Sequence, residues 1–140
     1  MIRFLLDTCL LSELVKPRPE QKVVDWVAGQ NEESLFLSVL TLGELQKRIR
    51  KCPDAQRKSK LQAWLDSDLV ARFQNRLLPV CEQVSLTWGR LSGDAELRGQ
   101  PLPVTDLLLA ATGVVHGLTV VTRNVRDLDR CSVTVFDPWA

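Results

Sequence analysis

Short apolar runs alternate with helical patterns along this sequence, and that alternation restricts the fold more than any other feature. Between the runs, apolar residues recur every three or four positions, which is the spacing of one helix face. Strands that alternate with helices typically form a parallel sheet between helix layers. The sequence therefore predicts an α/β fold with three layers, α/β/α, around a short central parallel sheet. The expected strands are Ile2–Leu6, Ser34–Leu37, Leu77–Val80, Leu118–Val121 and Val133–Phe136.

Proline and glycine residues mark where the helices between these strands begin and end. Pro53 separates two amphipathic helices that we expect to form a hairpin, and Pro79 indicates an edge strand. Gly117 is expected to end a helix that is apolar almost all round and therefore buried. The expected helices follow Asp7, pass through Val23–Val27, cover Ser38–Arg50, run from Asp54 to about Phe73, extend to about Leu97, and begin at Thr105.

The length of 140 residues, 45% of them hydrophobic, suits one substantial core better than two. We expect a single domain over residues 1–140. No apolar run approaches the roughly 18–20 uncharged residues of a membrane-spanning helix, and Asp7 interrupts the region where a signal peptide would still be apolar. The four cysteines form no CxxC pair, so no zinc site or disulfide framework is indicated. We expect no membrane span and a cytoplasmic location.

Basic residues cluster in one stretch, although the net charge of the chain is only +1. Asp54 is the only acid between Lys47 and Lys60. Such a stretch can neutralise the phosphates of a nucleic acid, but it can equally be a solvated helix face. The sequence leaves both interpretations open. The basic residues concerned are Lys47, Arg48, Arg50, Lys51, Arg57, Lys58 and Lys60.

Acidic residues fall near the ends of the expected strands. Asp7 follows the first strand directly, Glu44 lies in the helix after the second, and Asp106 opens the buried helix. A further polar position, after the fourth strand, is either Asn124 or Asp127. In open parallel sheets, ligands bind beyond the carboxyl ends of the strands. Carboxylates gathered there would repel one another unless a cation compensates, and oxygen ligands suit Mg²⁺ or Mn²⁺.

Each acid also has a purely structural interpretation. Asp7 can cap the next helix, while Thr41 and Glu44 match a capping box, in which Glu44 reaches back to a backbone amide. Asp106 at a helix N-terminus is stabilised by the helix dipole, by about 0.3–1 kcal/mol. Asp127 can be an ordinary surface acid. No single acid distinguishes a structural from a catalytic role, so the arrangement of the acids in the chain is the better guide.

Four stretches resemble the successive motifs of the PIN-domain family, and they occur in the order of that family. The ending from Val133 to Trp139 also resembles the last strand and tail of the VapC and FitB group. The resemblance therefore covers essentially the full chain. The four stretches are Phe4–Glu13, Ser38–Glu44, Pro103–Thr112 and Val121–Asp127.

The resemblance implies a metal-dependent endoribonuclease that hydrolyses RNA phosphodiester bonds and is the toxin of a VapBC-like toxin–antitoxin system. It implies that Asp7, Glu44 and Asp106 hold Mg²⁺ or Mn²⁺, and that Asn124 or Asp127 fills the fourth catalytic position. It further implies three partners, namely an RNA substrate, a cognate antitoxin protein and a second copy in a homodimer. The residues expected near the substrate are Thr8, Ser38, Thr122, Arg123, Lys47, Arg48, Arg50 and Lys51.

Two positions depart from the family pattern. Cys9 stands where the family usually has Asn, and a thiol cannot supply the hydrogen bonds of that amide, so weaker support of Asp7 is expected. Asn124 stands where the family often has an acid. The alternative function is therefore a catalytically inactive PIN-like module that binds RNA or a partner. A phosphotransferase with a strand-end aspartate nucleophile would need a second aspartate at position 9, and no phosphate-binding glycine loop is present.

Apolar residues on the expected helical hairpin have two possible uses. They can form a groove for a helix of the antitoxin, or they can pack in the core. Tryptophans elsewhere, at positions 26, 88 and 139, are expected to pack. The apolar residues of the hairpin are Val39, Leu42, Leu61, Trp64 and Leu65.

Overall fold

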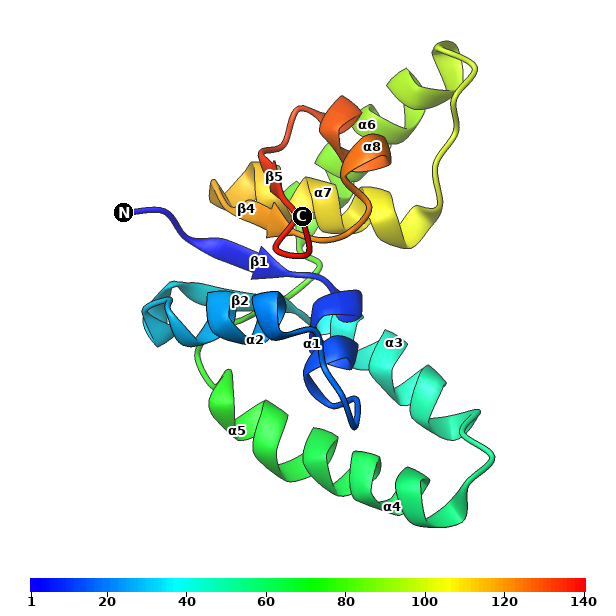
Figure 1. Ribbon diagram of the computed structural model, residues 1–140. Coiled ribbons are helices and arrows are strands. Elements are labelled where there is room, and N and C mark those ends of the chain that lie inside the picture. The colour runs from blue at the N-terminus through cyan, green and yellow to red at the C-terminus, as the bar shows by residue number, and fades with distance from the viewer.

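The computed structural model describes residues 1–140 as a five-stranded parallel sheet with helices on both faces (Figure 1). The strand order is β3-β2-β1-β4-β5, and every neighbouring pair is parallel. The predicted α/β fold with three layers is confirmed, as is the edge position of the strand that precedes Pro79. The strands are β1 (Phe4–Leu6), β2 (Leu35–Ser38), β3 (Leu77–Leu78), β4 (Thr119–Val121) and β5 (Val135–Phe136).

The longer helices occupy the segments that the sequence predicts, whereas the short helix α8 (Val125–Leu128) after β4 was not predicted. The expected helix from Asp54 to Phe73 contains a π-helical stretch, Trp64–Leu69, between two α-helical parts. No helix is long and apolar enough to cross a membrane. The α-helices are α1 (Thr8–Leu14), α2 (Gln21–Ala28), α3 (Val39–Arg50), α4 (Ala55–Ala63), α5 (Val70–Arg72), α6 (Glu82–Leu97), α7 (Val104–His116) and α8 (Val125–Leu128); the 3-10 turns are Glu32–Ser34 and Asp129–Cys131.

Two hydrophobic cores lie on opposite faces of the sheet. Successive residues of a strand point to opposite faces, so Leu6 packs into the core under α1–α5 and Leu5 into the core under α6–α8. Val121 and Val120 of β4 divide in the same way. Figure 1 shows the two helix layers below and above β1. The tryptophans at positions 26, 88 and 139 pack against these cores as predicted.

Helix caps differ from two of the expectations. The Ser38 hydroxyl accepts a hydrogen bond from Leu40 N at 3.1 Å, so α3 begins one turn before the expected capping box. Glu44 therefore lies inside the helix, and its side chain does not cap it. Helix α7 begins at Val104, one residue before the expected start at Thr105, and has no side-chain cap. Gly117 ends α7 as predicted, with a left-handed φ of 65°.

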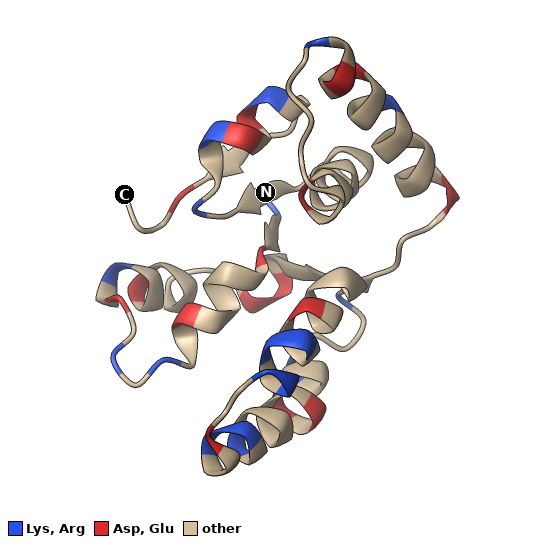
Figure 2. Cartoon of the chain, turned by 90° about the vertical axis from the view of Figure 1, so that its right-hand side faces the viewer, with Lys and Arg blue, Asp and Glu red and all other residues tan.

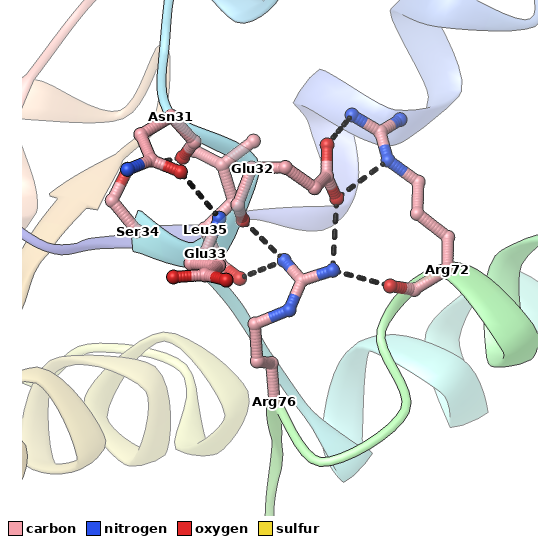
Figure 3. A network of polar contacts seen from close by, with 7 residues as sticks. All are labelled: Asn31, Glu32, Glu33, Ser34, Leu35, Arg72 and Arg76. Carbon is pink, nitrogen blue, oxygen red and sulfur yellow. Dashed lines mark hydrogen bonds and ion pairs between the residues drawn. The ribbon is translucent and has the colours of Figure 1, made fainter.

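A network of polar contacts fastens the edge of the sheet to the helix layer (Figure 3). The Glu32 carboxylate accepts hydrogen bonds from Arg72 Nε and Nη2 and from Arg76 Nη2, at 2.9 to 3.0 Å. Arg76 also donates to the carbonyl oxygen of Leu35 at 2.7 Å, and its guanidinium lies 5.0 Å from the centre of the Phe73 ring. Because these residues are about 40 positions apart in the chain, the network joins the start of β2 to the segment that leads into β3.

This network is expected to make the fold sensitive to acid. The hydrogen bonds from Arg72, together with Arg76, hold the pKa of Glu32 below its usual value of 4.5. A carboxyl with a lowered pKa stabilises the folded state above its unfolded pKa, and this contribution is lost as the pH falls through the folded pKa. Below pH 4.5, wild type should therefore lose more stability than Glu32→Gln.

Urea unfolding midpoints measured from pH 7 down to about pH 3 would test this expectation. Glu33→Gln is the matched control, because Glu33 neighbours Glu32 and makes no ion pair. The same acid dependence in wild type and Glu32→Gln would contradict the assigned role of Glu32.

Candidate functional site

The middle strand of the sheet ends at the point where the chain connections diverge. From β1 the chain continues to β2 on one side, and β4 lies on the other side. Ligands of parallel sheets bind at such a switch point, beyond the carboxyl ends of the strands. Asp7 follows β1, Ser38 is the last residue of β2, and Thr122 follows β4. The sheet thus brings together three polar residues that the sequence places far apart.

Asp7 is held by side chains from both neighbouring segments. Its Oδ1 accepts from Thr8 N at 2.7 Å, and its Oδ2 accepts from Thr122 Oγ1 at 2.7 Å and from Cys9 Sγ at 3.5 Å. Burial, with the negative charge of Asp7, raises the pKa of the Cys9 thiol to about 11, so the thiol keeps its proton. The thiol and Thr122 both donate to the same oxygen, the thiol at the longer distance, so weaker support of Asp7 by Cys9 stays a prediction.

Glu44 and Asp106 are each oriented by one neutral donor. Thr8 Oγ1 donates to Glu44 Oε1 at 2.8 Å, which links α1 to α3. Asn124 Nδ2 approaches Asp106 Oδ2 at 3.3 Å, which links the segment after β4 to the first turn of α7. Oε2 of Glu44 and Oδ1 of Asp106 accept no hydrogen bond from the protein. Both carboxylates therefore keep one oxygen available for another ligand.

The acids influence one another electrostatically. Burial raises the pKa of the Asp106 carboxyl, and the negative charges of Asp7, Glu44 and Asp127 raise it further. Asn124 contacts Asp106 directly, whereas Asp127 acts through its charge. Both candidates for the fourth position are therefore near Asp106: Asn124 through a hydrogen bond and Asp127 through its charge.

A basic cavity begins beside Glu44. Its volume is about 500 Å³, and it lies between α3 and the start of α7. Lys47, Arg48 and Lys51 supply three positive charges along one face of α3, and Thr105 lies on the side of α7. In Figure 2 several of the basic segments lie on the helical hairpin of α3 and α4 at the bottom of the view, and others lie elsewhere on the chain. The arrangement suits an anionic ligand that reaches from the acids onto α3.

The family model of the PIN domain matches residues 4–132 of this chain. The chain belongs to the PIN domain family. The match includes β1 to β4 and every acid described above.

Individual relatives agree with this membership over nearly the whole PIN domain. Toxin FitB of Neisseria gonorrhoeae is 32% identical over 135 residues, which are 96% of this chain and 97% of FitB. VapC ribonuclease Y4jK of Sinorhizobium fredii is 31% identical over 134 residues, 96% of each chain. The crystal structure of FitAcB from Neisseria gonorrhoeae superposes with a TM-score of 0.92 at 32% identity, covering 97% of this chain and 98% of that one.

The acids of this PIN domain fit a hard divalent cation in their chemistry. All the donors are carboxylate or amide oxygens, which Mg²⁺ and Mn²⁺ prefer. The pKa of Asp106 is raised by burial and then by repulsion from the other acids, and a bound cation would relieve that repulsion. In this arrangement no three His, Cys, Asp or Glu side chains lie close enough together to hold a metal ion. The residues therefore match the ligand type, and binding would require the carboxylates to draw together.

The predicted substrate residues fall into different surroundings in this PIN domain. Lys47, Arg48 and Lys51 line the basic cavity, whereas Arg50 does not. Ser38 is fully buried, with its hydroxyl engaged in capping α3. Thr8 and Thr122 are also buried and hold Glu44 and Asp7, as described above. Arg123 is exposed at the end of β4.

Sequence reasoning missed the contact that fixes Arg123. The Arg123 guanidinium lies 4.7 Å from the centre of the Trp139 ring, and Trp139 Nε1 donates to Glu13 Oε1 at 3.1 Å. Glu13 is buried, and the hydrogen bond from Trp139, followed by that from Lys16, lowers its pKa. The signal available in the sequence was a carboxylate among apolar residues of α1, between Leu11 and Leu14. A carboxylate in that setting requires a buried donor.

Proposed function

We propose that this chain is a metal-dependent endoribonuclease that cuts RNA phosphodiester bonds and acts as the toxin of a toxin–antitoxin pair. The observation that carries the proposal is that Asp7, Glu44 and Asp106 act on one another electrostatically at the switch point of a PIN domain sheet, where Glu44 also lines a basic cavity. The relatives named Toxin FitB and VapC ribonuclease Y4jK support it.

In this proposal, Asp7, Glu44 and Asp106 hold Mg²⁺ or Mn²⁺, and Asn124 or Asp127 completes the site. The bound ion supplies Lewis acidity, which activates water and offsets the charge that develops on the phosphate. Thr122 and Cys9 keep Asp7 in place, and Thr8 keeps Glu44 in place. Asn124 orients Asp106 through its amide. These neutral donors orient each carboxylate without adding to its charge.

Cleavage of a labelled RNA pool by the purified protein tests the proposal. Cleavage should occur with Mg²⁺ or Mn²⁺, stop when EDTA is added, and return when excess metal is restored. RNA that is bound but never cut, with either metal, would instead support the inactive binding module suggested by Cys9 and Asn124.

The lysines of the basic cavity are expected to bind RNA phosphates. Lys47→Glu combined with Lys51→Glu should weaken RNA binding and flatten its salt dependence by about 0.7 in the logarithmic slope for each phosphate that the protein no longer neutralises. Fluorescence anisotropy at several salt concentrations measures both quantities. Arg50→Glu combined with Lys58→Glu is the matched control, since it changes the charge equally outside this cavity. Equal losses in the two double variants would contradict a specific role of the cavity.

We further propose that an antitoxin segment packs on an apolar cavity of about 340 Å³ between α1, α3 and α4. Leu61 and Trp64 line it as expected, together with Val15. Leu65 does not, because it is buried in the core with 5% of its surface exposed. The solved FitAB complex bound to an IR36 DNA fragment, at 29% identity and a TM-score of 0.92, supports pairing with an antitoxin. A cytoplasmic location and a homodimer complete the proposal and stay predictions.

A further inference from the structure

Helix α3 contains a glycine in its middle that packing does not require. A Cβ atom built on Gly43 would meet no other atom within 4 Å. The contrast is Gly113 of α7, where a Cβ would come within 2.8 Å of a Val133 methyl group. Glycine is the least favourable residue in a helix interior after proline, so Gly43 weakens α3 without a compensating contact inside the protein.

Gly43 lines the basic cavity. It directly precedes Glu44 and lies one helical turn before Lys47, and both of these residues line the same cavity. At position 43, just before the carboxylate and one turn before the first ammonium group, the cavity surface of α3 is therefore bare backbone. Thr105 lies across the cavity, so a side chain at position 43 would project into the space between the two helices.

We propose that Gly43 is a specificity-determining residue that lets the sugar–phosphate backbone of the cut RNA strand lie against α3. This inference rests on the proposed ribonuclease function and adds to it the path of the strand. The phosphate next to the scissile one passes over Gly43 and reaches Lys47 and Lys51. The three cations of the cavity attract the negatively charged RNA strand. Glu44, at the end of the cavity, remains beside the scissile bond.

A leucine at this position tests the proposal, because leucine favours the helix and fills the cavity. Gly43→Leu is expected to raise the thermal unfolding midpoint and to weaken RNA binding in EDTA roughly 10-fold. It should also lower kcat/KM by about 10²-fold, because a small displacement of the substrate from the reacting groups can cost that much. Gly89→Leu is the matched control: Gly89 is also exposed in the middle of a long helix, α6, with nothing within 4 Å, but it lies outside the cavity. That variant should gain stability with unchanged RNA binding and cleavage.

Glu44→Gln separates obstruction of the cavity from disturbance of Glu44. It should reduce cleavage and leave RNA binding in EDTA unchanged or stronger, because it removes a negative charge. Weaker binding in Gly43→Leu alone would support the proposed strand path. If wild type binds and cuts RNA while Gly43→Leu binds equally well, or Gly89→Leu loses as much binding, the strand path is overturned and the ribonuclease function stands. If wild type neither binds nor cuts RNA, both the proposed function and the strand path are overturned.

Discussion

Asp7→Asn is expected to reduce RNA cleavage by roughly 10²–10³-fold, because a metal site supplies several kcal/mol of charge stabilisation in the transition state. Asparagine has the shape of aspartate and can still accept a hydrogen bond from Thr8 N. Its amide group carries no charge, and its nitrogen cannot accept from Thr122 Oγ1. The substitution therefore removes the proposed ligand while it preserves the volume of the side chain.

The same variant should keep its stability to within about 1 kcal/mol, since two effects oppose each other. The hydrogen bonds that Thr122 and Cys9 donate to Oδ2 disappear, but so does the repulsion that Asp7 exerts on Asp106. Cleavage rates and urea unfolding curves measured on one preparation separate the two quantities. Asp129→Asn is the control, because it removes an exposed acid that has no part in the site. Cleavage by Asp7→Asn at the wild-type rate would contradict the catalytic role of Asp7.

Phe73→Ala should lower the free energy of unfolding by about 3–5 kcal/mol, which is a large part of the roughly 5–15 kcal/mol that holds a typical domain. Phe73 has 1% of its surface exposed and packs in the core under α1–α5. Its ring also lies under the guanidinium groups of Arg72 and Arg76, at 5.3 and 5.0 Å from the ring centre. Truncation would thus leave a cavity and release both arginines of the Glu32 network.

Urea unfolding at neutral pH measures this loss. Val70→Ala is the control, because Val70 lies in α5, the helix that ends directly before Phe73, with 43% of its surface exposed, and should change the free energy by less than about 0.5 kcal/mol. Similar effects of the two substitutions would show that Phe73 is less important than its burial indicates.

Local patterns in the sequence predicted the parts of the site that lie at the ends of strands. An apolar run followed by Asp7 indicated a strand that ends in a carboxylate, and Leu118–Val121 followed by Thr122 indicated a strand that ends in a hydroxyl group. The position of Glu44 was also predicted, but its structural interpretation as part of a capping box was wrong. The hydroxyl of Ser38 caps the helix one turn earlier, which leaves Glu44 free to bond with Thr8.

Contacts between distant segments could not be read from local patterns. Trp139 and Glu13 are 126 positions apart, and nothing in either neighbourhood specifies their hydrogen bond. The sequence could not choose between Asn124 and Asp127 either, because the choice depends on how α8 faces α7. The empty surface above Gly43 also became visible only in three dimensions, since a glycine in a sequence does not show whether its missing side chain is needed for packing.

Because β1 pairs with β4, the acidic site can form only late in the synthesis of the chain. Phe4 pairs with Thr119, and Leu6 pairs with Val121, so one side of the middle strand can pair only after more than 110 further residues have been made. At a translation rate of roughly 5–20 residues per second, the synthesis of those residues takes on the order of 10 s. During this time the Asp7 carboxylate lacks Thr122 and Asp106, because both residues have yet to be synthesised. A nascent chain on the ribosome therefore cannot assemble the acidic site until β4 has emerged.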